Sequence, residues 1–316
     1  MYLIIIFIIL VCYIIGLFTL NKFYKKSNHY TNQFIDSQKF PPHKKGLQVI
    51  NLGSNQPKFA FDYSNTDIKG DNWAVGPQTF EYDFSILKKF HSFLAQQGVV
   101  VIPICLFSFF LYRKENRITH YKYYTFLDRD LIVNPSNKEY QKELKYPLLS
   151  HPLRIRYLLK DIPKDTRLEW KENPLKAKEE LEKDSKRWIE CWNKEFNINI
   201  DNLKLSKKNK DDIQANINIL HEMLQFCIDR SYRPIIALLP VTEYLSNKLP
   251  TNFIEDYILT YINEANTFNI PIMNYVKDTR FTNPDLYINS FFFNKKGRSL
   301  FTATFINDLK SKKFIC

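Results

Sequence analysis

The sequence predicts an α/β fold, a three-layer α/β/α sandwich around a five-stranded, parallel, doubly wound sheet. Two observations carry this prediction. Short apolar runs recur along the chain and are typical of strands that helices cover on both faces. Stretches with apolar residues at helical spacing separate these runs, and this alternation favours a parallel sheet. The expected strands are residues 49–52, 71–76, 99–107, 235–241 and 270–275, and the expected helices are 81–97, 211–230, 252–266 and 295–310.

The N-terminus predicts a transmembrane helix. Residues 3–20 are uncharged and apolar, and at about 1.5 Å per residue they are just long enough to span a bilayer. No small-x-small cleavage site follows, so we expect residues 1–20 to be an uncleaved anchor rather than a signal peptide, and a buried soluble helix is the alternative. Residues 21–46 are polar and contain two prolines, which indicates a stalk, and the domain extends over residues 47–316.

The middle of the chain interrupts the alternation of strands and helices. Residues 107–210 are aromatic, basic and rich in helix formers, above all from Pro174 to Phe196. A tract of this length between two core elements indicates a lid or an inserted subdomain. We expect its tryptophans to pack it against the domain, and an aromatic platform for a sugar is the alternative. These tryptophans are Trp170, Trp188 and Trp192.

Composition limits the chemistry that the chain can perform. The net charge of +12 is compatible with a nucleic acid, a membrane surface or an anionic polymer, or with a solvated lysine-rich surface. No nucleic-acid recognition motif accompanies the charge, so we do not expect nucleic acid as a partner. With 7 glycines, the chain has neither a P-loop nor a GxGxxG pattern. The cysteines lack zinc-ligand spacing and we expect no metal or cofactor; a Cys191–Cys227 disulfide has no support in the sequence.

A serine in a turn is the strongest candidate for chemistry. Gly53-Ser54-Asn55 follows the first strand, at the strand end where open α/β sheets gather their ligands. Such a turn can present a hydroxyl beside a backbone N–H, and these groups can form a nucleophile and an oxyanion hole. The alternative is an ordinary strand-to-helix turn in which Ser54 or Asn55 caps the helix.

Three segments together resemble the SGNH (GDSL-like) hydrolase superfamily, and especially its membrane-anchored branch linked to cell-envelope polysaccharides and teichoic acids. They are INLGSNQ after the first strand, the strand VVVIPICLF and NPDLYINSFFFNKKGRSLFT near the C-terminus. The resemblance implies an SGNH/flavodoxin-like α/β/α fold, with Ser54 as the nucleophile and its N–H as an oxyanion donor. It makes Gly76 the match to the second-block glycine, and Gln78 would replace an oxyanion donor. The third-block Gly-x-Asn-Asp signature does not follow VVVIPICLF, where only Ser108 is near.

The C-terminal block departs from the family at its catalytic positions. The family carries Asp-x-x-His before an Asn-x-x-Gly turn, and Asn294 and Gly297 supply that turn here. Asn289 takes the Asp position and Phe292 the His position, and a phenylalanine cannot accept a proton from a serine. Asp285 is out of register as a substitute. None of the histidines lies in a motif, although an inserted lid could bring His120 or His151 over Ser54; the six are His29, His43, His91, His120, His151 and His221.

Two functions follow from the resemblance. The first is a serine ester hydrolase or O-acyltransferase acting on envelope glycans. The second is a catalytically inactive SGNH-like protein that binds a glycan or an envelope-assembly protein through the same cleft. The implied partners are the membrane and an anionic cell-envelope polysaccharide. The implied location is the bacterial inner (cytoplasmic) membrane with the domain outside, although Lys22, Lys25 and Lys26 after the apolar run favour the opposite orientation.

Overall fold

The computed structural model describes residues 2–111, 122–133, 142, 144–160, 162–164 and 177–315. The chain forms two compact units. The first, which we call the anchor unit, comprises Met1–Phe40 and Glu115–Glu169, and the second, the sheet unit, comprises Pro41–Lys114 and Trp170–Cys316. The expected insertion at residues 107–210 is therefore divided between the two units.

The sheet unit contains the predicted five-stranded, all-parallel sheet. Its strands lie in the order β2-β1-β3-β4-β5, and this order reverses direction at β1, between β2 and β3. The strands are β1 (Leu47–Asn51), β2 (Gly70–Asn72), β3 (Leu94–Ile104), β4 (Arg233–Leu238) and β5 (Ile272–Asn274).

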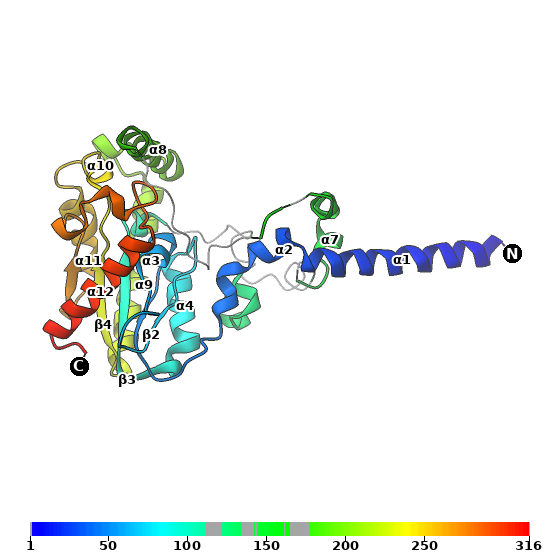
Figure 1. Ribbon diagram of the computed structural model, residues 1–316, viewed down its shortest axis with the longest axis horizontal. Coiled ribbons are helices and arrows are strands. Elements are labelled where there is room, and N and C mark those ends of the chain that lie inside the picture. The colour runs from blue at the N-terminus through cyan, green and yellow to red at the C-terminus, as the bar shows by residue number, and fades with distance from the viewer. Residues whose placement is uncertain are drawn as a thin grey trace. The chain divides into compact units, whose positions relative to one another are not determined.

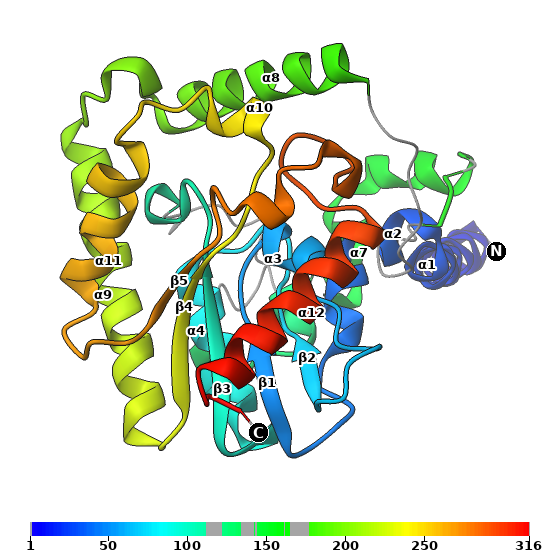
Figure 2. The same cartoon turned by 60° about the vertical axis from the view of Figure 1, so that its left-hand side comes forward.

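Helices cover both faces of the sheet (Figures 1 and 2). On one face, α9 (Lys207–Asp229) contacts both α4 (Phe80–Phe90) and α11 (Thr260–Ala265). On the other face, α3 (Asn55–Ala60) contacts α12 (Lys295–Ser311), which Figure 2 shows crossing in front of the strands. This division is expected because right-handed crossovers place the helices on opposite faces when the strand order reverses.

Successive residues of a strand point to opposite faces of the sheet, so the strands contribute to an apolar layer on each face. Val49, Val101 and Ile235 pack on the α12 side with Phe301 and Phe305 of that helix. The neighbouring strand residues are fully buried as well, so apolar layers cover the sheet on both faces, as the continuous apolar runs predict.

The structure moves some predicted boundaries. The helix expected over residues 81–97 ends at Phe90; a 3₁₀ turn, η2 (His91–Phe93), follows it, and β3 begins at Leu94. The apolar spacing continued through Leu94 and therefore did not mark this change. The helix expected over residues 252–266 begins at Phe253 and contains a π-helical segment, η8 (Glu255–Leu259), before α11.

One further long helix and several short elements complete the sheet unit. A long helix from the expected insertion, α8 (Lys178–Phe196), contacts α10 (Glu243–Ser246). Trp192 of α8 is buried, whereas Trp170 lies outside the described residues. The remaining 3₁₀ turns are η3 (Ser108–Phe110), η7 (Ile200–Asn202), η9 (Thr279–Phe281) and η10 (Pro284–Leu286).

The anchor unit is built around α1 (Tyr2–Lys26), a helix long and apolar enough to span a membrane. Residues 21–40, which we expected to be part of a polar stalk, are folded instead: Tyr24, Ile35 and Phe40 are buried. Phe40 stacks on Phe126 at 4.4 Å between ring centroids. The short helices of this unit are α2 (Asn28–Gln33), η1 (Ile35–Lys39), η4 (Tyr123–Thr125), η5 (Arg129–Leu131), α7 (Pro147–Ser150) and η6 (Pro152–Leu158).

Candidate functional site

Ser54 lies directly after β1, in the turn that leads into α3. Gly53 has a φ of +113°, and a Cβ atom there would lie 2.5 Å from Cγ of Pro57, so only glycine fits this turn. The Ser54 side chain does not cap α3. Its Oγ instead accepts a hydrogen bond from the N–H of Gln78 at 3.0 Å. Ser54 thus occupies the N-cap position of α3, but its side chain makes no capping hydrogen bond.

A buried carboxylate holds the backbone next to Ser54. Asp83 of α4 accepts a hydrogen bond from the N–H of Gly53 at 2.6 Å and another from the side-chain amide of Gln78. The same amide donates to the carbonyl of Gly53 at 3.2 Å. The Gln78 side chain is thus bonded to the turn itself. The sequence does not single out Asp83, because nothing in the spacing of α4 distinguishes it from an exposed acidic residue.

Gly76 supports the site from outside the pocket. A Cβ atom on Gly76 would lie 1.6 Å from Oδ1 of Asn55, so the absence of a side chain lets Asn55 occupy this position. Asn55 lines the pocket beside Ser54, whereas Gly76 is not among its lining residues.

The C-terminal segment reaches the same site. Phe292 lines the pocket that Ser54 lines, and its ring contacts Phe59 and Trp188 at centroid distances of 5.1 and 5.7 Å. Asn289 does not line the pocket. Its Oδ1 accepts hydrogen bonds from the N–H groups of Phe291 and Phe292, at 2.8 and 2.7 Å, and so closes the turn.

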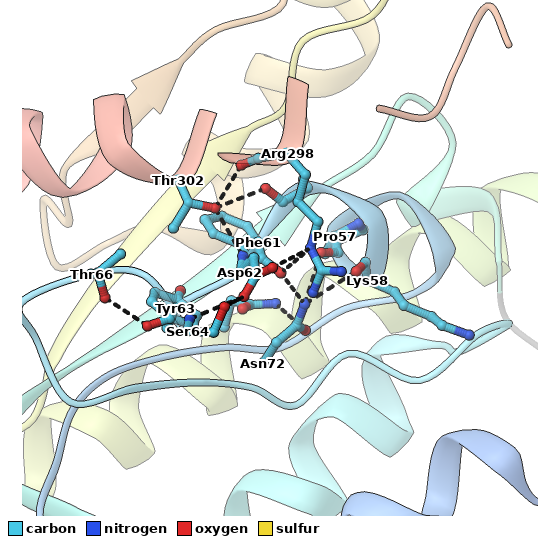
Figure 3. A network of polar contacts seen from close by, with 12 residues as sticks. Pro57, Lys58, Phe61, Asp62, Tyr63, Ser64, Thr66, Asn72, Arg298 and Thr302 are labelled. Atoms are coloured by element: carbon cyan, nitrogen blue, oxygen red, sulfur yellow. Dashed lines mark hydrogen bonds and ion pairs between the residues drawn. The ribbon is translucent and has the colours of Figure 1, made fainter. Parts of the chain in front are cut away.

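Polar contacts hold that segment to the start of α12 and to α3. Asn294 caps α12 by accepting from the N–H of Gly297 at 3.0 Å. Figure 3 shows how α12 then contacts the end of α3: Arg298 donates to the carbonyl of Phe61, and Thr302 accepts from the N–H of Asp62. These contacts join the segment that carries Phe292 to the helix that follows Ser54.

Helix α8 fixes the segment from the other side. Asp184 accepts hydrogen bonds from the N–H and the hydroxyl of Ser290, at 2.9 and 2.7 Å. Although burial alone would raise the pKa of Asp184, the hydrogen bonds from Ser290 and Arg187 lower it below the ordinary value. Thr242 also binds the carbonyl of Ser290, through both its N–H and its hydroxyl.

The pocket lies at the carboxyl ends of β1 and β3, where the strand order reverses, and has a volume of about 150 Å³. Its polar lining includes Ser54, Asn55, Gln56 and Gln78 together with the carboxylates of Asp83 and Glu195. Its aromatic lining consists of Phe80, Phe107, Trp188, Trp192, Phe196, Phe291 and Phe292.

Two residues that line this pocket each have a buried polar atom without a partner among the described residues. The Gln56 side chain is 4% exposed and its Nε2 donates to the carbonyl of Pro240 at 3.1 Å, which leaves the buried Oε1 without a donor. The buried indole Nε1 of Trp188 has no acceptor. A ligand or an ordered water with both kinds of group could satisfy them.

No histidine among the described residues lines the pocket. In the sheet unit, His91 binds Tyr232 and His221 binds the carbonyl of Ala265. His151 belongs to the anchor unit and His120 lies outside the described residues. Cys105 does line the pocket, but burial raises its pKa to about 12, so the thiol stays protonated and unreactive at neutral pH.

The described part of the chain contains neither a candidate metal-binding cluster nor a disulfide bond. It contains no cluster of three or more histidine, cysteine or acidic side chains that could hold a metal ion. Cys191 and Cys227 are both free thiols.

Comparison of the whole chain with protein-family models and with curated proteins finds no match.

Proposed function

We propose that the chain is a membrane-anchored, SGNH-like protein of cell-surface polysaccharide metabolism whose pocket binds an acylated sugar without hydrolysing it. The observation that carries this proposal is the position of Phe292. It shares the pocket with Ser54 and packs on Trp188 and Phe59, in the place where the resemblance calls for a catalytic histidine. Asp83 and Glu195 line the same pocket, but among the described residues the Ser54 hydroxyl has no hydrogen bond to a histidine or a carboxylate. A serine hydroxyl without a general base in hydrogen-bond contact is a poor nucleophile, so the pocket is suited to binding.

The pocket offers the contacts that an acylated sugar needs. Ligand sites combine apolar and aromatic walls with a few placed polar groups. The aromatic lining would cover the apolar face of the ring and the acyl methyl group. Gln56 Oε1 would accept a hydrogen bond from a sugar hydroxyl, and Trp188 Nε1 would donate to the acyl carbonyl, so each unpartnered atom would gain a partner.

The anchoring part of the proposal is supported by α1. Its length and its apolar composition suit a bilayer span, and its large apolar side chains are exposed from Tyr2 to Phe18. An anchored protein would meet polymers that are assembled or modified close to the membrane surface. The excess of basic residues would favour an anionic polymer.

A serine ester hydrolase or O-acyltransferase is the second candidate. It is favoured by the position of the Ser54 hydroxyl, which lines the pocket and lies 3.0 Å from the N–H of Gln78, a group that could also bind an oxyanion. In this function Ser54 would carry the acyl group as a covalent ester.

Binding and labelling experiments on the full chain in lipid nanodiscs test the proposal. Saturation-transfer NMR with an O-acetylated methyl glycoside should detect binding to the parent protein. Gln56→Leu, and Trp188→Phe, which keeps an aromatic ring but removes the N–H, should each weaken binding about fivefold, the effect of one neutral hydrogen bond. Gln214→Leu, at an exposed position of α9, is the matched control and should bind like the parent.

A fluorophosphonate probe distinguishes the two candidates. The non-hydrolytic pocket predicts no labelling of Ser54 and equal, background release of acetate from the glycoside by the parent and by Ser54→Ala. Labelling or acetate release that Ser54→Ala abolishes would instead establish the esterase. Absence of binding by the parent protein would refute the sugar-binding proposal.

A further inference from the structure

The anchor unit carries an exposed apolar and basic segment beside α1. We call residues 144–160 the juxtamembrane segment. Large apolar side chains in it remain in solvent: Leu153 is 79% exposed and Leu159 is 89% exposed, with Leu149 and Ile155 partly exposed as well. Basic residues are interspersed among them, namely Lys145, Arg154, Arg156 and Lys160.

Hydrogen bonds and ring contacts fix the first part of this segment to the end of the apolar run of α1. Asn21 donates to the carbonyl of Lys145 at 2.9 Å and accepts from the N–H of Leu148 at 3.2 Å. One turn earlier, Phe18 contacts Tyr146 edge to face at 5.4 Å between centroids. The segment therefore begins at the level where the apolar run ends.

The chain after the segment is held by α2, the helix that follows α1. Asn28 and Asn32 of α2 donate to the carbonyls of Ile162 and Pro163. Within the segment, Tyr157 stacks on His29 at 3.7 Å. The segment thus runs beside the chain from Phe18 to Asn32, and it starts at the level where a spanning helix would leave the hydrocarbon. The headgroup zone that follows is roughly 5–8 Å thick on each side of a bilayer.

We propose that the juxtamembrane segment lies in the headgroup layer of the membrane that α1 spans and binds anionic phospholipids there. Exposed leucines with interspersed basic side chains are typical of interfacial segments, because the apolar groups enter the acyl boundary while the cations bind anionic headgroups. Tyr146 suits the same layer, since amphipathic rings gather at membrane interfaces. This inference depends on the anchoring part of the proposed function, and not on the pocket.

The test uses spin labels on the full chain in vesicles. Cys12, Cys191 and Cys316 are replaced by serine, and single labels are placed by Leu153→Cys, Leu159→Cys, Ile8→Cys in α1 and Glu222→Cys, an exposed site on α9. Collision rates with oxygen, which enters lipid, and with a water-soluble nickel chelate are measured. Vesicles contain phosphatidylcholine either alone or with 30% phosphatidylglycerol.

In the anionic vesicles, labels at positions 153 and 159 should collide readily with oxygen and rarely with the nickel chelate, whereas the label at 222 shows the reverse. The double variant Arg154→Gln/Arg156→Gln should shift the insertion equilibrium of the segment roughly tenfold or more toward water. The double variant Arg154→Lys/Arg156→Lys, which keeps both charges, should preserve insertion. In phosphatidylcholine alone, insertion should be weaker in the parent and insensitive to the glutamine pair.

Each other result overturns the inference. Labels at 153 and 159 that react with the nickel chelate like the label at 222 would show the segment in water. Labels protected from both reagents would show that protein covers it. The label at position 8 distinguishes failure of membrane anchoring from failure of the inference. If this label is also in water, α1 does not anchor the protein. If it lies in lipid while the labels at 153 and 159 do not, only the inference about the juxtamembrane segment fails.

Discussion

At Ser54, the neighbouring groups decide what the hydroxyl can do. Its Oγ accepts a hydrogen bond from Gln78, and Asp83 holds the adjacent N–H of Gly53. None of these contacts withdraws a proton from the serine. The residue that completes the pocket, Phe292, cannot do so either. A serine in a favourable turn is therefore only one part of a serine-hydrolase site, which also needs a base within hydrogen-bond reach of the hydroxyl.

Gly76 provides a prediction at the scale of one residue. Gly76→Ala would place a Cβ atom 1.6 Å from Oδ1 of Asn55, which must then move out of its position. We expect the substitution to lower the free energy of unfolding by about 1–3 kcal/mol, the usual cost of overpacking. Urea unfolding followed by tryptophan fluorescence measures it. Asn55→Ala in the same chain should recover most of the loss, and a single variant as stable as the parent would contradict the account.

At the scale of elements, α8 and the turn at residues 289–292 form one wall of the pocket. Asp184 binds Ser290, and the rings of Trp188 and Trp192 pack on Phe291 at 5.2 and 5.4 Å between centroids. The sequence indicated helix formers from Pro174 to Phe196, within the expected insertion. The contact partner of this helix was not predicted, because a carboxylate on an amphipathic helix ordinarily faces solvent and its spacing does not indicate a partner 106 residues away.

Protonation of Asp184 at low pH should reduce the stability that its hydrogen bonds give to this wall. Because its pKa is lowered in the folded protein, its stabilising contribution is complete above the ordinary carboxyl pKa of about 4 and is lost as the pH falls through the lower folded value. Asp184→Asn should lower the free energy of unfolding by about 2 kcal/mol at pH 7, and this difference should shrink toward pH 3.

Urea titrations between pH 3 and pH 7 check the response. Glu190→Gln, at an exposed position of the same helix, serves as the control and should follow the parent at each pH. A difference between parent and Asp184→Asn that stays constant over this range would show that the carboxylate charge does not stabilise the wall.

At the scale of the whole molecule, the membrane-spanning candidate α1 and the pocket belong to different units. The anchor unit holds α1 together with residues 115–169, and the sheet unit holds the pocket. The two segments of the anchor unit, which end at Phe40 and begin again at Glu115, are 75 positions apart in the sequence. No local pattern reveals that they fold together. The sequence-based division into anchor, stalk and domain therefore differs from the units that the contacts define.

The proposed function predicts an orientation for the molecule. A pocket that binds envelope sugars must face the envelope, so we expect the C-terminus outside the cytoplasmic membrane, against the tendency of Lys22, Lys25 and Lys26 to stay inside. Alkaline phosphatase fused after residue 316 should be active, since this enzyme needs an oxidising compartment, and a fluorescent protein fused there by the same export route should be dark. The opposite pair of results would place the pocket in the cytoplasm.

Much of the candidate site could be anticipated where the signal was local. The turn at Gly53-Ser54-Asn55 and the cap formed by Asn294 and Gly297 each depend on neighbouring residues, and both are formed as expected. The resemblance placed Ser54 and Phe292 at one catalytic site, and the two residues line the same pocket. Asp83, Gln56 and Asp184 were missed because their partners come from other elements.

The sequence by itself determined the five strands, their parallel arrangement and the apolar N-terminal helix, because hydrophobic periodicity reports directly which residues leave water. Only the tertiary structure decided which polar groups find partners: Asp83 and Asp184 do, whereas Gln56 Oε1 and Trp188 Nε1 have none among the described residues. A buried polar atom is satisfied or left open by the position of atoms far away in the chain, and periodicity carries no information about those positions.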